Sequence, residues 1–503
     1  MTAIAIIGGG LAGLAAAVAA RQAGLDVELF EARRRLGGRA GSFRDPVSGE
    51  LVDHCQHVAM GCCTNLADFC RRTGIDACFR RHRRLTFIGP DARPHALAAA
   101  WLPAPLHLLP GLFRLGYLSR ADRWRIVRTL VRLARWKPLG DIAIADCRLQ
   151  PQLAPAATPV TIGGDMTIGD WLSQQGQSQQ AVERFWSVVL VSALGETLDR
   201  ASLAAAQKVF VDGFLAHRRA YELLVPDAPL GEIYDQRLAN WLAAAGVRLH
   251  LGARVRRIEG DASRAAGLVL DDGPPRPFDH FILAVPWRAA ADLLSPPLRA
   301  ATPALEAARG FTASPITAVH LWFDRPIMPC EHAVLVGRLS QWVFHHRRRT
   351  PHAPREGARH TEREGVRHAE RDEYDGYYQV VISGSHRLEG GDRQAIVDGV
   401  CRELQATWPQ AREATRLRWR MVTEPEAVFS YRPGLDAQRP AQQTPVSNLL
   451  VAGDWTRTGW PATMEGAVRS GYLAVERLLE TLGRRESILV PDLPRSLLCR
   501  WLT

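Results

Sequence analysis

The chain opens on a short apolar run that is followed at once by glycines and then by a long alanine-rich stretch. Residues 3–7 are apolar and rich in isoleucine, which is typical of a buried parallel strand. The alanine-rich stretch predicts a helix that runs to about Ala23 and stops at Gly24, and residues 27–30 predict a second strand. This order predicts a βαβ unit at the start of an α/β domain.

Similar patterns return much later in the chain. A helix is predicted from about Tyr234 to Ala245, and apolar strands follow at 247–251 and 281–286. Residues 448–454 predict another strand, which ends in Gly-Asp and precedes a helix through Leu479. Between these regions, residues 167–214 predict helices that we assign to a substrate domain.

The glycines after the first strand fit the pattern G-x-G-x-x-G, with Gly8, Gly10 and Gly13. Gly8 permits a tight turn, Gly10 lets a pyrophosphate approach the backbone, and Gly13 lets the helix pack closely on the strand. The helix N-terminus, at Leu11 and Ala12, offers N–H groups and a positive dipole end to phosphates. The pattern therefore predicts a dinucleotide site.

Glu31 ends the second strand, where a carboxylate can accept the two ribose hydroxyls of an adenosine. This acid favours FAD or NAD over NADP, because it would repel a 2′-phosphate. Residues 33–42 then form a second loop of glycines and arginines, with Gly37 and Gly38 passing close to a ring and Arg39 near the diphosphate. NAD dehydrogenases do not need such a loop, so we predict FAD.

These motifs, together with residues 453–467, resemble those of the FAD-dependent amine oxidase and phytoene desaturase superfamily. The resemblance implies that Asp454 binds the ribityl chain or diphosphate, and that the helix beginning near Met464 points its N-terminus at the pyrimidine end of the flavin. It also implies that residues 317–323 and 378–383 are strands roofing a substrate cavity. The residues predicted to bind FAD are Gly8, Gly10, Leu11, Ala12, Gly13, Glu31, Ala32, Arg33, Gly37, Gly38, Arg39, Cys55, Gln56, Val255, Gly453, Asp454, Pro461, Ala462, Thr463, Met464 and Ala467.

Within that superfamily the chain most resembles the hydroxysqualene dehydroxylase family, also called squalene-associated FAD-dependent desaturases. The resemblance spans nearly the full chain and is most specific at Asp53, Gln56, His57, the 61–64 turn and residues 453–467. The family commonly reads Asp-Asn-Gly-Gln-His where this chain has His and Cys at its second and third positions, 54 and 55.

This resemblance implies reductive dehydroxylation of hydroxysqualene to squalene in hopanoid biosynthesis, with hydride delivered from reduced flavin N5. The leaving hydroxyl needs a general acid. His57 is the first candidate, Asp53 orients it or acts beside it, and Glu465 is the third. Only one nucleotide fingerprint is visible, so the electron donor is left open.

Three other functions remain open. A carotenoid-type desaturase would run hydride transfer in the opposite direction on the same fold. A flavin amine oxidase usually places a lysine near flavin N5. The only lysine outside the basic residues 80–137 is Lys208, and it is predicted to be ill-placed for this role. A non-catalytic prenyl-lipid carrier is the third, against which the intact flavin motifs argue.

We predict an α/β fold with a discontinuous Rossmann-type FAD-binding domain, an inserted α+β substrate domain and a helical membrane-facing lobe. The FAD-binding domain is predicted to consist of residues 1–78, 229–290 and 426–483. Residues 79–228 are assigned to the helical, membrane-facing lobe and the first section of the substrate domain. Residues 291–425 form its second section, with a solvated His- and Arg-rich loop at 345–373, and residues 484–503 form a C-terminal tail.

The net charge of +11 is concentrated in residues 80–137, where 13 basic residues meet two acids. Prolines interrupt the uncharged stretch between Arg93 and Arg114, which excludes a straight transmembrane helix there. After a capping box at 119–122, a helix to about Trp136 is predicted to be amphipathic. Its apolar side would carry Trp124, Val127, Leu130, Val131 and Ala134, and its basic side Arg125, Arg128, Arg132 and Arg135.

Such a helix favours contact with an anionic bilayer, and the alternative is a solvated face on a helix packed against its own domain. No recognised module accompanies the charge, so nucleic acid is not a predicted partner. Nothing at the N-terminus resembles a signal peptide, and we expect a cytoplasmic protein peripheral to the inner face of the cytoplasmic membrane. The nine cysteines show no C-x-x-C spacing, so no metal site is predicted.

Overall fold

The computed structural model describes residues 2–137, 166–271, 273–346 and 376–502. Residues 151–159, in which three prolines indicate a linker, lie outside the described residues, and so do all but the first two residues of the predicted 345–373 loop. Those two residues, His345 and His346, belong to a strand rather than to a loop.

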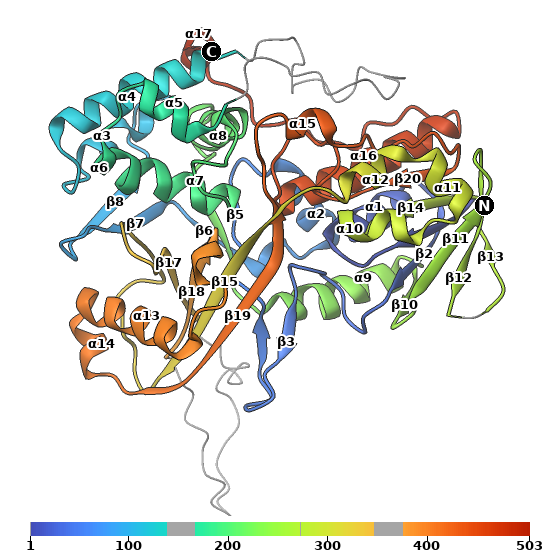
Figure 1. Ribbon diagram of the computed structural model, residues 1–503, viewed down its shortest axis with the longest axis horizontal. Helices are drawn as coiled ribbons and strands as arrows, with labels where there is room; N and C mark the ends of the chain where they lie inside the picture. Colours follow the sequence, from blue (N-terminus) through green and yellow to red (C-terminus); the bar gives the residue numbers. More distant parts are fainter. Residues whose placement is uncertain (1, 138–165, 272, 347–375, 503) are drawn as a thin grey trace, which may run out of the picture.

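A five-stranded parallel sheet forms the centre of the dinucleotide-binding half (Figure 1). Its order is β10-β2-β1-β14-β20, and every neighbouring pair is parallel. The strands are β1 (Ala3–Ile7), β2 (Asp26–Glu31), β10 (Arg248–Leu251), β14 (His280–Leu283) and β20 (Leu449–Val451). They come from three distant regions of the chain, so the predicted discontinuous Rossmann-type sheet is present; the exact domain boundaries stay a prediction.

The strands β1, β14 and β20 are buried on both faces, which explains why they are almost entirely apolar, whereas β2 and the edge strand β10 also carry charged residues. Successive side chains alternate between faces, so Ile4 and Ile6 enter one hydrophobic core while Ala5 and Ile7 enter the other. The helices packed into the first core include α1 (Leu11–Gln22), α2 (Thr64–Thr73), α9 (Ala239–Ala244) and α16 (Met464–Thr481). On the other face lie α10 (Trp287–Ala290), η6 (Ala291–Leu293), α11 (Pro296–Ala301) and α12 (Pro303–Ala308).

An early and a late helix of the chain meet where α1 packs on α16. A Cβ added to Gly471 of α16 would lie 2.3 Å from the carbonyl oxygen of Ala12 and 2.8 Å from the nitrogen of Ala16. Only glycine therefore lets the two helices approach this closely. Residues 463–467, at the start of α16, are thereby held against the first glycine loop.

A second, seven-stranded sheet lies beside the first, with the order β19-β15-β18-β17-β16-β7-β8. Its strands are β7 (Arg84–Ile88), β8 (Pro94–Ala98), β15 (Ala313–Phe323), β16 (His332–Leu335), β17 (Trp342–His346), β18 (Tyr377–Ser383) and β19 (Arg416–Phe429). The strands predicted at 317–323 and 378–383 are confirmed. Through β7 and β8, the start of the region 79–228 joins this sheet.

The remaining strands form small sheets around these two. They are β3 (Ser42–Arg44), β4 (Leu51–Asp53), β5 (Ala59–Met60), β6 (Phe79–His82), β9 (Leu223–Pro226), β11 (Val255–Gly260), β12 (Ala265–Leu270) and β13 (Arg276–Pro277). The other helices and helical turns are η1 (Asp76–Cys78), η5 (Glu232–Leu238), η7 (Ser385–Leu388), α13 (Arg393–Thr407), α14 (Pro409–Glu413) and α15 (Leu435–Gln438).

A helical region covers the outer end of the second sheet (Figure 1). It contains η2 (Leu106–Leu108), α3 (Leu109–Phe113), α4 (Arg120–Arg135), α5 (Ile168–Gln174), α6 (Gln179–Ala181), η3 (Val182–Trp186), α7 (Ser187–Leu194), α8 (Leu203–Phe210) and η4 (Val211–Leu215). The C-terminal helix α17 (Leu497–Leu502) packs beside α4. Of the helices that the structure describes, none is both long and apolar enough to span a bilayer.

The predicted start of α4 is confirmed, because the Ser119 side chain accepts a hydrogen bond from the Asp122 backbone N–H. The predicted basic side is exposed as expected. Of the predicted apolar side, Ala134 is buried and Val127 and Leu130 pack partly buried against the core, next to the fully buried Ile126 and Leu133. Trp124 instead lies on the exposed face with the arginines, at 63% exposure.

Candidate functional site

A cavity of about 650 Å³ lies at the carboxyl end of the parallel sheet and extends toward the second sheet. Ligands of open α/β sheets bind at this end, where the loops after the strands diverge. Every residue predicted to bind FAD lines the cavity except Gly13. The predicted cofactor residues, which are spread over almost the whole sequence, therefore form one site.

The three glycines of the first loop have the separate roles that the sequence predicts. Gly8 has φ +112°, a conformation that side chains disfavour, and an added Cβ would lie 2.3 Å from the carbonyl oxygen of Ala284. A Cβ on Gly13 would lie 1.9 Å from the carbonyl oxygen of Gly8, so Gly13 serves helix–strand packing. A Cβ on Gly10 would meet no protein atom within 4 Å. Gly10 thus faces open space, as a pyrophosphate site requires.

Glu31 fastens the first glycine loop to the second. Its carboxylate accepts hydrogen bonds from the backbone N–H groups of Gly9, at 2.7 Å, and Arg33, at 2.8 Å. The backbone N–H of Gly37 also donates to the carbonyl of Gly9, at 2.8 Å. These contacts hold the Glu31 carboxylate in the cavity wall, where adenosine hydroxyls can reach it.

Arg39 and Asp454 join the two ends of the chain across the cavity wall. Arg39 Nη2 lies 2.5 Å from Asp454 Oδ1, and Arg39 Nη1 donates to the carbonyl of Ala427 at 2.8 Å. The Asp454 side chain is 5% exposed and the Arg39 side chain 31%, so the carboxylate is shielded from water while the guanidinium is partly exposed. The motifs that the sequence assigned to one cofactor are therefore in direct contact.

Arg439 positions the loop that carries Asp454, a role that the sequence analysis missed. Its guanidinium is buried and donates to the carbonyl of Asp454 at 2.9 Å, to the carbonyl of Trp460 at 2.9 Å and to the hydroxyl of Thr458 at 2.9 Å. Binding so many loop acceptors offsets the cost of burying the charge. An isolated arginine 15 residues before the motif carries no sequence signal for this role.

The start of α16 lies where the resemblance implies. Thr463 caps it, since its hydroxyl accepts a hydrogen bond from the Gly466 N–H at 3.0 Å. Pro461, Ala462, Thr463 and Met464 all line the cavity at this end. The positive end of the helix dipole there favours a ligand that carries negative charge.

Glu465 is fully buried and caps a different helix. Its carboxylate accepts hydrogen bonds from the backbone N–H groups of Asn65, at 3.1 Å, and Leu66, at 2.7 Å, in the first turn of α2. α2 begins at Thr64 without a cap from a side chain of its own, and Glu465 satisfies its N-terminal donors. Burial raises the pKa of Glu465, although Arg469 and these N–H groups oppose the rise. Both oxygens are engaged in positioning α2, and Glu465 also lines the cavity, so its catalytic role stays a prediction.

His57 lines the cavity and is held by the backbone. Its Nδ1 lies 2.9 Å from the carbonyl oxygen of Cys55, so Nδ1 carries the proton and Nε2 is the nitrogen available to a ligand. Burial lowers the pKa of His57, although the Cys55 carbonyl opposes this. Burial also raises the pKa of the Cys55 thiol to about 12, so it stays protonated.

Asp53 does not orient His57, contrary to the prediction. Its carboxylate accepts hydrogen bonds from the Ser42 hydroxyl and from the Leu230 N–H, and Ser42 in turn accepts from the Gly231 N–H. Asp53 thus ties β3 and β4 to the start of η5, and it does not line the cavity. Burial raises its pKa to about 7.

Lys208, which was predicted to be ill-placed for the role that a lysine has near flavin N5 in amine oxidases, lines the same cavity. Its Nζ lies 2.7 Å from Asp212 and 3.2 Å from Asp492, and 4.7 Å from the ring centre of Trp460. Burial alone would lower its pKa, but the two carboxylates outweigh this and raise the pKa. Lys208 therefore stays a cation and is not a base.

Beyond the cofactor residues the cavity has an apolar arm. Its wall comes from α7, η4 and the second sheet, and Ser192 in it is satisfied, since its hydroxyl accepts from Trp342 Nε1 at 2.9 Å. The apolar residues of this arm are Leu85, Phe87, Val188, Val189, Phe214, Leu223, Ile316, Trp342, Phe344, Val381 and Val428. Such a lining suits a long hydrocarbon chain.

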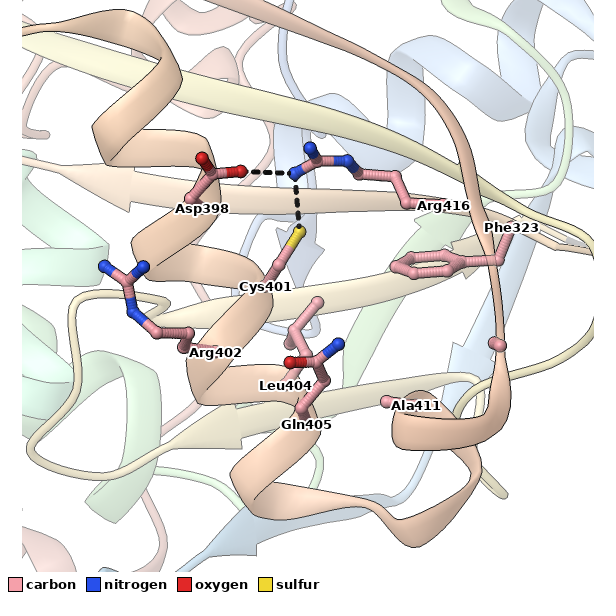
Figure 2. Close-up of a pocket in the computed structure, with 9 residues that line it drawn as sticks. Phe323, Asp398, Cys401, Arg402, Leu404, Gln405, Ala411 and Arg416 are labelled. Atoms are coloured by element: carbon pink, nitrogen blue, oxygen red, sulfur yellow. Dashed lines mark hydrogen bonds and ion pairs between the residues drawn. The ribbon is translucent and has the colours of Figure 1, made fainter.

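A second cavity, of about 380 Å³, lies between α13 and β19 (Figure 2). Its charged groups bind each other: Arg416 donates to Asp398 at 2.9 Å and lies 3.3 Å from the Cys401 sulfur. Burial raises the pKa of Cys401, and no predicted site residue lines this cavity. Over the described residues, no group of three or more histidine, cysteine or acidic side chains is arranged to hold a metal ion.

The parallel sheet, the glycine loop with its acid and the contacting C-terminal motif define a dinucleotide-dependent oxidoreductase of the flavoprotein type. Comparison with protein families agrees, since residues 11–479 match the model of the flavin containing amine oxidoreductases. The chain belongs to this family and is an FAD-dependent oxidoreductase.

Two curated relatives are similar over nearly the whole chain. Hydroxysqualene dehydroxylase of Sinorhizobium fredii is 27% identical and covers 94% of this chain and 97% of its own length. Hydroxysqualene dehydroxylase of Rhodopseudomonas palustris is 26% identical with the same coverage. The resemblance that the sequence analysis named is thus confirmed. Among solved structures, cyclohexylamine oxidase of Brevibacterium oxydans superposes with a TM-score of 0.64 at 19% identity, covering 96% of this chain and all of its own, which supports the fold.

Proposed function

We propose that this FAD-dependent oxidoreductase removes the hydroxyl group of hydroxysqualene to give squalene. The observation that carries the proposal is a single cavity whose wall passes from the flavin residues, through His57, into the apolar arm. A C30 hydrocarbon with one polar group fits such a wall. The names of the two relatives support the same substrate class.

Atoms and electrons balance in this reaction when one proton and one hydride are supplied. The carbon–oxygen bond breaks and the hydroxyl leaves as water after accepting the proton, while the hydride forms the new carbon–hydrogen bond. Bound FAD, when reduced, supplies that hydride and is reoxidised, so an external reductant of unassigned chemistry must restore it. The chain's own residues hold the substrate, exclude water and deliver the proton.

His57 is our candidate to deliver the proton. The Cys55 carbonyl fixes its Nδ1–H, so a second proton on Nε2 would point to the ligand side of the ring. Burial disfavours that charged form, and negative charge in the cavity would restore it. Protonation of His57 is therefore expected to depend on how much negative charge the cavity holds.

The substrate is a membrane lipid by its chemistry, so we also propose that the protein works at the inner face of the cytoplasmic membrane. The exposed arginines of α4 support electrostatic attraction to anionic lipids. The electron donor stays open.

The proposed function is tested under anaerobic conditions. Dithionite-reduced protein is incubated with hydroxysqualene, and the products are separated and identified by mass spectrometry. With excess dithionite removed before hydroxysqualene is added, we expect squalene in an amount that does not exceed that of the reduced flavin. Absence of squalene would overturn the proposal. Conversion of a polyene by the oxidised protein, with no squalene from the reduced one, would instead favour a desaturase.

A further inference from the structure

The C-terminal helix α17 exposes its apolar side chains in spite of being docked on the protein. The Ser496 hydroxyl donates to the carbonyl of Ala104 at 2.6 Å, and the Ser496 N–H donates to the carbonyl of Ala216 at 3.0 Å. The Cys499 side chain is buried, whereas Leu497 and Trp501 are 75% and 88% exposed. The helix is thus held in one orientation with its apolar side outward.

Other exposed apolar residues lie beside α17. Trp101 and Leu106 flank Ala104, which binds Ser496, and Trp124 lies on α4, which contacts α17 (Figure 1). Of the nine large apolar residues that are exposed in the described chain, six belong to this region. We call them the tryptophan surface: Trp101 (87% exposed), Leu106 (39%), Trp124 (63%), Leu497 (75%), Leu498 (44%) and Trp501 (88%).

Positive charge borders the tryptophan surface. On α4 the side chains of Arg120, Arg128 and Arg135 lie on the same helical face as Trp124, because they are four or eleven residues away. These arginines are exposed, and within the stretches of chain that the structure describes no acidic residue pairs with them. Indoles flanked by arginines are typical of proteins that sit in the interface of an anionic bilayer.

The same surface lies close to the apolar arm of the cavity. Phe214 lines that arm, and Ala216, two residues further on, accepts the hydrogen bond that anchors α17. A lipid leaving a bilayer at α17 would therefore be near the helix that forms the cavity wall.

We propose that α17, with the 101–106 loop and the outward face of α4, docks the protein on an anionic bilayer, and that Trp101, Trp124 and Trp501 enter its interface. The proposal deepens the proposed function, whose lipid substrate it would admit. The positive charge of this surface favours a bilayer over a second copy of the chain. A second copy would bring the same arginines together, and they would repel each other, whereas anionic headgroups attract them.

The test uses the full chain loaded with flavin, without substrate, so that it does not depend on dehydroxylation. Binding to vesicles of phosphatidylcholine with phosphatidylglycerol is measured by flotation for wild type and for a Leu497→Ser, Trp501→Ser double variant. A matched control replaces Leu251 and Leu417, which are also exposed but lie outside the surface, with serine. Flavin content confirms that each variant is folded.

We expect wild type and control to float with the vesicles and the double variant to bind at least about tenfold more weakly, a loss of about 1.4 kcal/mol. Wild-type binding is expected to weaken with added salt, and pure phosphatidylcholine to bind less. Equal binding of the double variant and wild type would overturn the proposal. So would a wild type that forms dimers in solution which the double variant loses, because the surface would then be a self-association interface.

Discussion

Arg39 and Asp454 lie 415 residues apart in the chain and form an ion pair of 2.5 Å in the cavity wall. Each belongs to a motif that the sequence assigns to the same cofactor, one near each end of the protein. Because of this contact, we expect FAD binding to require that the early and the late motif are folded against each other.

Replacing Glu31 with arginine should abolish retention of FAD. The substitution removes the acceptor for the Gly9 and Arg33 N–H groups and for the ribose hydroxyls. Hydrogen bonds to a charged group contribute roughly 1.5–3 kcal/mol, so FAD affinity should fall by at least about tenfold. Flavin absorbance of the purified protein measures this, with Glu389→Arg, at an exposed surface position, as control. Normal occupancy in Glu31→Arg would contradict the adenosine role.

The first glycine loop allows cofactor binding and folding to be separated. Gly10→Ala adds a methyl group that meets no protein atom, so the apoprotein should unfold at the wild-type temperature but bind FAD poorly. Gly13→Ala instead drives a methyl group into the carbonyl of Gly8 and should destabilise the apoprotein by about 1–3 kcal/mol. Thermal unfolding of both apoproteins measures the loss of stability, and flavin titration measures the loss of FAD affinity. A destabilised Gly10→Ala apoprotein with normal FAD affinity would refute the assignment.

His57→Gln should retain FAD and lose at least about a hundredfold in the rate of dehydroxylation, as expected when a general acid is removed. The pKa of His57 is lowered by burial, so activity that depends on its protonated form should fall as the pH rises. Single-turnover rates across pH measure both effects, with His217→Gln, a residue outside the cavity lining, as control. A variant as active as wild type would remove His57 from the mechanism.

Asp53 should make the protein less stable as pH rises. Below about pH 4 its carboxyl is protonated in both states; above that the unfolded carboxyl ionises while the folded one, with a pKa of about 7, keeps its proton. Unfolding therefore becomes easier up to about pH 7, by at most roughly 4 kcal/mol. Asp53→Asn keeps an oxygen for Ser42 and Leu230 without this penalty.

Thermal unfolding of Asp53→Asn and wild type at about pH 5 and about pH 8 tests this shift. The stability of the variant relative to wild type should be greater at the higher pH. A difference that is the same at both pH values would show that the Asp53 carboxyl is not held protonated.

Charge reversal on α4 should weaken binding to anionic vesicles. A basic residue near such a surface contributes about 1 kcal/mol, so replacing Arg128, Arg132 and Arg135 with glutamate should lower affinity at least roughly a hundredfold in low salt. Arg125 is left in place because it pairs with Asp122 at 3.3 Å. The control reverses Arg402, Arg412 and Arg485, which gives the same net charge at exposed positions elsewhere. Equal loss in both variants would mean that only net charge matters.

The flavin site could be predicted because its signals are local. Strand, glycines, helix and acid all lie within residues 3–31, and the spacing of the glycines is itself the signal, although the Ala284 carbonyl that excludes a side chain at Gly8 lies far along the chain. The C-terminal motif was recognised in the same way from residues 453–467. What joins them, the Arg39–Asp454 ion pair and the burial of Arg439, depends on packing between distant segments and was not predictable.

The predicted catalytic roles of Glu465 and Asp53 were harder to judge from the sequence, because their contacts also depend on packing between distant segments. The Glu465 carboxylate binds α2, 400 residues earlier in the chain, and Asp53 binds the start of η5. On α4 the prediction failed at Trp124, which was placed on the apolar side: Trp124 and Ile126 are both apolar, yet only Ile126 is buried. Periodicity fixes a helix more reliably than it fixes which side faces the core.

A crystal structure of the protein loaded with FAD would test the central claim most directly. We predict one flavin per chain, with its adenosine at Glu31, its diphosphate over Gly10 beside Arg39 and Asp454, and its ring between residues 37–39 and the start of α16. A flavin bound elsewhere, or one that contacts Glu31 while Asp454 lies outside its site, would contradict the account.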